Sequence, residues 1–369
     1  MNRLFGWKQT GVFLLALAAG ILPFAVPEVC AAALREGLTL CSGPLLLSLF
    51  PFLVVSRLLI QCPESDLLAL PFRLAAWGIG IRTPCAARVL CIGFLGGFAP
   101  AASAAAQAVR TGQLTAEEAD ALLPACICSG PSFVVLTVGQ SLLGSAELGV
   151  LLFASQITAN YLTAALLNRF AGVRSVKPGS AAPASPAPPR LDEILADAAI
   201  TYCKLCGFIL FFRMLAAGAG ALLPAGAGTL CSVLLEVCSG CDLASRTGRW
   251  GSLLCCAALS VQGLSVLLQV RTICPPEMTL HPLYRSRLLH LPLSLALFYL
   301  LLPGGEADVF STLPARVLLM RRVPPDCALL VFAVCCMAAC TLRSGIRQVE
   351  QKQMARNAGG CCINSKTLL

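Results

Sequence analysis

The chain has 369 residues, of which 57% are hydrophobic and 12% are charged, whereas soluble domains carry about 25% charged residues. No water-soluble packing hides that much apolar side chain, so the composition excludes an ordinary soluble domain and predicts an integral membrane protein. The net charge of +9 does not indicate nucleic-acid binding, because the Lys and Arg residues stand singly at the ends of apolar runs, where such residues orient membrane helices.

Apolar runs recur along the chain, and a helical membrane span needs roughly 20 such residues. In chain order the runs cover residues 11–27, 40–61, 86–108, 126–144, 147–170, 199–223, 228–244, 252–274, 286–302 and 325–342. The first run resembles a signal peptide, but further spans follow, which favours a retained span. Because several runs are short or interrupted, they predict an all-α polytopic membrane protein with about eight to ten membrane segments.

Glycine, proline and polar residues interrupt several of these runs. Helix breaks are expected at Gly97 to Pro100, at Ser129-Gly130-Pro131, at Ser239-Gly240 and at Gln262-Gly263. A backbone amide left unpaired in hydrocarbon costs several kcal/mol, so a broken helix must be buried in protein or line a cavity. The breaks are therefore predicted to point inward.

A Pro- and Ala-rich stretch without apolar periodicity predicts a linker between two halves of the chain. The basic residues near the C-terminus favour the cytoplasmic side. The expected organisation is an N-terminal membrane span at 1–36, a first membrane repeat at 37–172, the linker at 173–190, a second membrane repeat at 191–303, a C-terminal loop and last span at 304–345, and a basic cytoplasmic tail at 346–369.

The two halves contain similar segments. Residues 130–136 resemble residues 263–269, each following a small or polar residue within an apolar run. Paired broken helices are typical of duplicated transporter folds, in which they mark a site near the membrane midplane. The pattern predicts two pseudo-symmetric repeats with broken or re-entrant helices. In the first half, Thr115 followed by Glu117 and Glu118 also predicts a capped turn between two helices.

Several motifs support a family resemblance over roughly residues 40–302. They are Phe50-Pro51-Phe52, Gly97-Phe98-Ala99-Pro100, Ser129-Gly130-Pro131-Ser132-Phe133, Leu234-Leu235-Glu236-Val237 with Ser239-Gly240, and the stretch from Gln262 through Gly263 and Ser265 to Gln269. Together they resemble the YlbJ-like sporulation integral membrane proteins, which carry nucleoside-recognition (Gate) domains. Two departures, Ala99 before Pro100 and Cys241-Asp242 after Gly240, affect the geometry at the breaks.

The resemblance implies Gate-type repeats and a multi-pass protein in the cell membrane of a sporulating, endospore-forming bacterium. A fold does not by itself supply a substrate. The resemblance therefore leaves the solute open.

The candidate substrate-binding residues lie at and around the breaks. The amides at half-helix N-termini carry a partial positive charge, and Ser and Gln side chains offer hydrogen bonds to a polar solute. Glu236 is an ionisable residue inside an apolar run and is a candidate for binding a proton or cation, with capping of a broken helix as the alternative. For the Ser and Gln residues the alternative is helix-helix hydrogen bonding. The full set is Gly97, Pro100, Ser129, Gly130, Pro131, Ser132, Glu236, Ser239, Gly240, Gln262, Gly263, Ser265 and Gln269.

The predicted function is to bind or move a small polar solute during spore envelope maturation. A non-transporting membrane scaffold or signalling component of spore envelope assembly is the alternative. The expected partners are the lipid bilayer, a small polar solute and a coupling ion, with no nucleic acid and with homo-oligomers left open. No enzyme motif occurs, so no catalytic residue, cofactor or metal is predicted.

Overall fold

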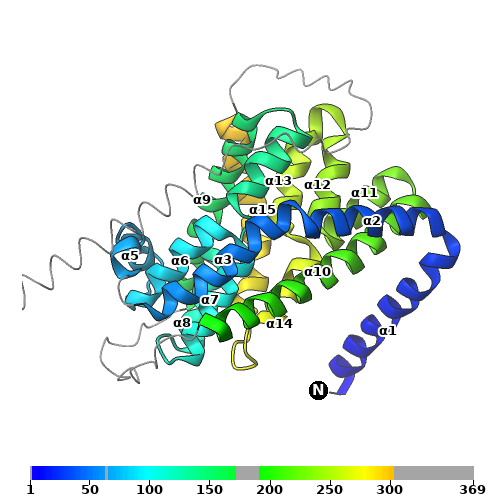
Figure 1. The fold of residues 1–369 in the computed structure, drawn as a ribbon. Helices are drawn as coiled ribbons and strands as arrows, with labels where there is room; N and C mark the ends of the chain where they lie inside the picture. Colours follow the sequence, from blue (N-terminus) through cyan, green and yellow to red (C-terminus); the bar gives the residue numbers. More distant parts are fainter. Residues whose placement is uncertain (1, 63–64, 172–190, 303–369) are drawn as a thin grey trace, which may run out of the picture.

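The computed structural model describes residues 2–62, 65–171 and 191–302 (Figure 1). Every regular element in these ranges is a helix, which confirms the predicted all-α class for this part of the chain. The expected linker at 173–190, the last span at 325–342 and the tail at 346–369 lie outside the described residues.

The chain begins with α1 (Asn2–Ala25), which diverges from the main body, and α2 (Pro27–Ser42), which packs along α10 (Figure 1). The expected boundary after residue 36 falls inside α2. Glu36 is tolerated within this apolar helix because its carboxylate pairs with the guanidinium of Arg213, with Nη2 and Oε2 2.8 Å apart. After Gly43 come α3 (Pro44–Gln61), α4 (Ser65–Leu68) and α5 (Leu70–Gly78).

The first set of broken helices follows. It comprises α6 (Pro84–Gly96), α7 (Phe98–Arg110), α8 (Ala116–Cys126), the π-helix η1 (Ser132–Leu142) and the long α9 (Ala146–Ala171). The predicted breaks at Gly97 and at Ser129-Gly130-Pro131 are confirmed, since α6 stops at one and η1 begins after the other. The predicted cap is also confirmed, because Thr115 Oγ1 accepts from the Glu118 amide and the Glu118 carboxylate accepts from the Thr115 amide.

The second set comprises α10 (Leu191–Leu222), α11 (Ala225–Leu235), α12 (Val237–Ser245), the short 3₁₀ helix η2 (Gly248–Trp250), α13 (Gly251–Val261), α14 (Gly263–Ile273) and α15 (His281–Leu301). The predicted break at Gln262-Gly263 is confirmed. The one predicted at Ser239-Gly240 is wrong, because the chain breaks at Glu236 and both residues lie within α12. Gly240 instead allows α12 to pack closely on α11, since a Cβ at this position would lie 2.8 Å from the Cα of Val233.

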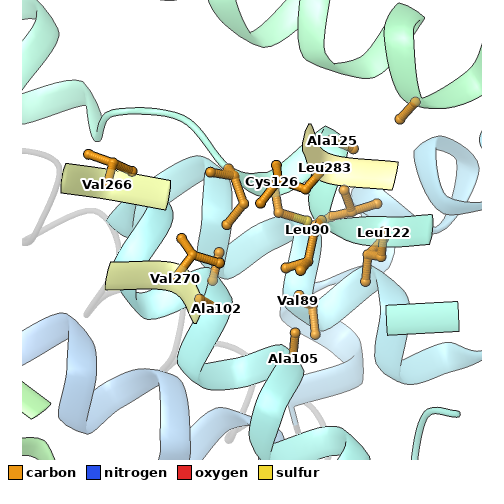
Figure 2. Close-up of a cluster of buried hydrophobic side chains, with 14 of the residues drawn as sticks. Val89, Leu90, Ala102, Ala105, Leu122, Ala125, Cys126, Val266, Val270 and Leu283 are labelled. Carbon is orange, nitrogen blue, oxygen red and sulfur yellow. The ribbon is translucent and has the colours of Figure 1, made fainter. Parts of the chain in front are cut away.

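Helices from the two halves pack against each other in one core. Helix α7 contacts α14, η1 contacts α12, and α9 contacts α15. Figure 2 shows part of this core, where Val270 of α14 lies near Ala102 of α7 and Leu283 of α15 lies near Cys126 of α8. The halves therefore form one hydrophobic interior.

Four helical stretches are long and apolar enough to cross a membrane, namely Pro27–Leu47, Ala146–Ala171, Leu191–Leu222 and Gly248–Ile273. Large apolar side chains such as Phe170 and Leu288 are 82% and 78% exposed, as suits a surface that meets lipid. Shorter apolar helices such as α6, with 13 residues, rise only about 20 Å, less than the roughly 30 Å hydrocarbon core. The described part has the character of an α-helical membrane protein in which several helices stop partway.

Candidate functional site

In each half, two chain breaks lie directly against each other. A Cβ on Gly97 would lie 2.6 Å from the amide nitrogen of Gly130, and a Cβ on Gly263 would lie 2.9 Å from the carbonyl oxygen of Leu235. Real Cβ atoms do not approach so closely. Both glycines also have left-handed backbone angles, with φ of +80° and +69°, which only glycine adopts without strain. The sequence thus places glycine where backbone meets backbone.

A cavity of about 60 Å³ lies where these breaks converge. It brings together residues at the end of α6, at the start of η1, at the start of α12 and on α14. Of the predicted site residues, those that line the cavity are Ser129, Gly130, Pro131, Ser132, Glu236 and Gln269.

Glu236 is only 2% exposed and lies in extended conformation between α11 and α12. Its carboxylate caps α12, because Oε1 accepts from the Cys238 amide at 2.9 Å and Oε2 accepts from the Ser239 amide at 2.7 Å. The predicted capping alternative is therefore observed. Among the described residues, no Lys, Arg or His side chain forms an ion pair with this carboxylate.

Two glutamines of the second half carry buried amide groups. Gln269 donates from Nε2 to Ser265 Oγ at 2.8 Å, while its Oε1 is buried without a hydrogen-bond partner. Gln262 is 1% exposed, its amide nitrogen and oxygen both lack partners, and its φ is +63°. Such a combination of backbone strain and unpaired buried polar atoms is costly and is characteristic of functional sites.

The other predicted residues do not line the cavity and have supporting positions. Gly97 and Gly263 allow the close contacts of the breaks, and Pro100 lies in the first turn of α7, where its missing N–H has no intrahelical partner to lose. Ser265 holds the amide of Gln269. Ser239 donates its backbone amide to the Glu236 carboxylate. Gly240 packs against Val233, and Gln262 lies at the break between α13 and α14.

Sequence reasoning missed the apolar wall of the cavity. Leu45, Leu49 and Phe52 line it from α3, and Phe98 and Phe133 line it immediately after two of the breaks. The spacing of the three α3 residues places them on one helix face, which is a signal that the sequence contains. Further wall residues are Leu95, Ile209, Val237, Cys238 and Val266.

A second buried polar cluster joins α9 of the first half to α13 of the second. Gln156 Nε2 donates to Ser260 Oγ at 2.9 Å and to the Cys256 carbonyl at 3.2 Å. Ser260 Oγ also lies 2.5 Å from Ser294 Oγ of α15. These contacts bury polar groups that would be costly in lipid if unpaired. They therefore fasten the two halves together.

Arg287 of α15 binds the first half close to its break. Its guanidinium donates to Asn160 Oδ1 at 3.1 Å and to the carbonyls of Ile127 and Pro124 at 3.4 and 3.5 Å. The last carbonyls of a helix have no intrahelical partner and carry partial negative charge. Arg287 therefore satisfies the end of α8, which sequence reasoning did not identify.

Among the described residues, no group of three or more His, Cys, Asp or Glu side chains is placed to hold a metal ion. The cysteines within these ranges are free thiols, including both CxxC pairs, at Cys203 with Cys206 and at Cys238 with Cys241.

The fold and the site of the described residues define a class, a helical protein with membrane-length helices whose chain breaks line a small cavity containing a carboxylate. Comparison with known proteins finds no matching family model, no matching curated protein and no matching solved structure.

Proposed function

We propose that this chain is a transporter-like membrane protein that binds or moves a small polar solute at the cavity between its helix breaks. The observation that carries the proposal is that breaks from both halves of the chain line one cavity, whose lining includes the buried residues Glu236 and Gln269. Broken helices in membrane proteins are tolerated where they are buried or line a cavity, and in carriers they form the solute site.

The proposed architecture is a pair of Gate-type pseudo-symmetric repeats. The contacts between helices support this pairing. If α6, α7, α8, η1 and α9 correspond in order to α11, α12, α13, α14 and α15, the contact of α7 with α14 has its counterpart in that of α12 with η1. The contact of α8 with α15 likewise has its counterpart in that of α13 with α9. A two-fold relation between the halves accounts for both pairs.

The proposed setting is the cell membrane of a sporulating bacterium during spore envelope maturation. It rests on the motifs around Gly97, Ser129 and Gln262 and on their resemblance to sporulation membrane proteins. Deletion of the gene in a spore-forming host tests this setting by counting heat-resistant spores. Normal spore numbers and normal envelope layers would contradict it.

The volume of the cavity limits the solute in this conformation. Pockets for drug-sized ligands have about 300–1,000 Å³, whereas a water molecule takes roughly 30 Å³ of liquid volume. The cavity of about 60 Å³ therefore has room only for very small solutes in this conformation, and a nucleoside would need a wider one.

The same small volume favours a second candidate function, that of a membrane scaffold of spore envelope assembly. In a scaffold the breaks would be closed by permanent packing, and the apolar wall formed by Leu45, Leu49 and Phe52 would serve stability alone. The two candidates differ in whether a solute crosses the membrane.

Solute flux in proteoliposomes distinguishes them. We expect the purified full-length protein to move one or more members of a panel of nucleosides, amino acids and small carboxylates. Gly130→Leu places a bulky side chain in the cavity lining and is expected to abolish that flux. Gly207→Leu is the matched control, because nothing lies within 4 Å of a Cβ at this helical glycine. Absence of flux from folded wild-type protein would favour the scaffold. Equal flux from both variants would leave a carrier but contradict the placement of the solute at this cavity.

A further inference from the structure

Glu236 is the one acidic residue that lines the cavity, and none of the ion pairs among the described residues includes it. Glu236 and Arg213 lie within electrostatic range of each other, but the Arg213 guanidinium is paired with the Glu36 carboxylate at 2.8 Å. The α12 amides stabilise the Glu236 carboxylate with hydrogen bonds but bring no full positive charge. A buried carboxylate is costly unless a positive charge is paired with it.

The cavity also presents neutral oxygen atoms. Gln269 is 2% exposed, lines the cavity and has a side-chain oxygen with no hydrogen-bond partner. The hydroxyl-bearing residues Ser129 and Ser132 line the same space. Gly96, the last residue of α6, lies there too, and the C-terminal end of a helix carries partial negative charge. An occupant that accepts electrons from oxygen satisfies all of these groups.

Size and ligand type narrow the occupant further. A volume of about 60 Å³ is small beside the roughly 300–1,000 Å³ of pockets for drug-sized ligands, which suits a small ion with bound water. Calcium takes six to eight oxygen ligands, commonly with several carboxylates, whereas a single carboxylate lines this cavity. One carboxylate with neutral oxygens balances a single positive charge.

We infer that the cavity is a binding site for one alkali cation of about the size of sodium, held by the Glu236 carboxylate and the Gln269 side-chain oxygen. This inference rests on the proposed function in that it assigns the coupling ion to the same cavity. The serine hydroxyls and a water molecule complete the oxygen environment. The cation neutralises the buried carboxylate and ties α12 to α14 across the break at Glu236.

Equilibrium binding of radioactive sodium to the purified full-length protein in detergent tests the site. Ionic strength is held constant with choline chloride, and unlabelled sodium, potassium and ammonium salts are used as competitors. We expect saturable binding of one ion per chain, with displacement by unlabelled sodium. Glu236→Gln removes the charge and keeps one of the two acceptor oxygens of the cap, and Gln269→Leu removes the side-chain oxygen. Each is expected to weaken binding by roughly tenfold or more.

Glu147→Gln is the matched control, because Glu147 is an exposed glutamate in the first turn of α9 and does not line the cavity. It is expected to bind sodium like the wild type. Far-UV circular dichroism and monodisperse gel filtration establish that each variant is folded. Absence of saturable sodium binding by the folded wild type, or equal binding by all three variants, would overturn the inference.

The failure of this inference and the failure of the proposed function give different results. Solute flux without sodium binding would support the carrier function and refute the cation site. Sodium binding that depends on Glu236, without flux of any solute, would support the cation site and refute the carrier function.

Discussion

The replacement Gly97→Ala tests the close contact between the two breaks of the first half. Gly97 has φ +80° and ψ −164°, a region open essentially to glycine alone, and another residue there costs of order 1–3 kcal/mol. The added Cβ would also lie 2.6 Å from the Gly130 nitrogen and 2.9 Å from its Cα. Overpacking of this kind adds about 1–3 kcal/mol. We expect a total loss of roughly 2–6 kcal/mol in the free energy of unfolding.

Substitutions at two other glycines separate the cost of backbone strain from the cost of the close contact. Gly112 has φ +68° with nothing within 4 Å of a Cβ, so Gly112→Ala should show the backbone strain alone. Gly207 is helical and equally open, so Gly207→Ala should stabilise the protein by up to about 1 kcal/mol. The measurement is equilibrium unfolding in mixed micelles with increasing SDS, followed by circular dichroism. Equal losses for Gly97→Ala and Gly112→Ala would refute the backbone contact with Gly130.

Three further replacements test the supporting structure. The Asp120 carboxylate accepts from the backbone amides of Thr279 and Leu280. Asp120→Ala should therefore lower the free energy of unfolding by about 1.5–3 kcal/mol per charged hydrogen bond lost and expose residues 274–280 to protease. Unchanged protease resistance would contradict this expectation. Thr115→Ala should cost about 1 kcal/mol through loss of the α8 cap, measured in the same unfolding assay, and no loss would contradict the cap. Gln262→Gly should raise stability by about 1 kcal/mol while reducing solute flux in proteoliposomes, and undiminished flux would show that the buried amide has no functional role.

The sequence predicts much of the fold because its signals are local. The all-α class follows from long apolar runs, and the breaks at Gly97, Gly130 and Gln262 follow from residues that cannot continue a helix or that need unusual backbone angles. The cap at Thr115 follows from a four-residue pattern. Each of these features depends on neighbours in the chain, which the sequence displays directly.

The third break was misplaced because its cause is tertiary. Ser239-Gly240 looks like a helix breaker, but Gly240 serves the close approach of α12 to Val233, while the interruption occurs at Glu236. Nothing in the local sequence distinguishes a glycine that ends a helix from one that packs against its neighbour. The function of a single glycine therefore depends on which helix lies opposite.

Only part of the candidate site could be predicted, because some of its residues are visible in the local sequence and others depend on tertiary packing. Glu236 and Gln269 are polar residues within apolar runs, so they stand out in the sequence. Arg287 was missed because it lies near the start of an apolar run, where an arginine ordinarily reaches water, and only the packing of α15 on α8 brings it to buried carbonyls. Buried partners over 100 residues apart, such as Gln156 and Ser260, leave no local trace.

The paired breaks also determine how this protein can change shape. Because backbone touches backbone at Gly97 with Gly130 and at Gly263 with Leu235, neither break of a pair can shift without displacing the other. Motion is left to the contact surface between the halves, where Ala102 of α7 lies near Val270 of α14 (Figure 2). Short aliphatic side chains make a low-relief surface, and packed helices with such surfaces slide by small shear steps. If one half slides past the other, the hydrogen bonds that Gln156 and Arg287 form between the halves must break.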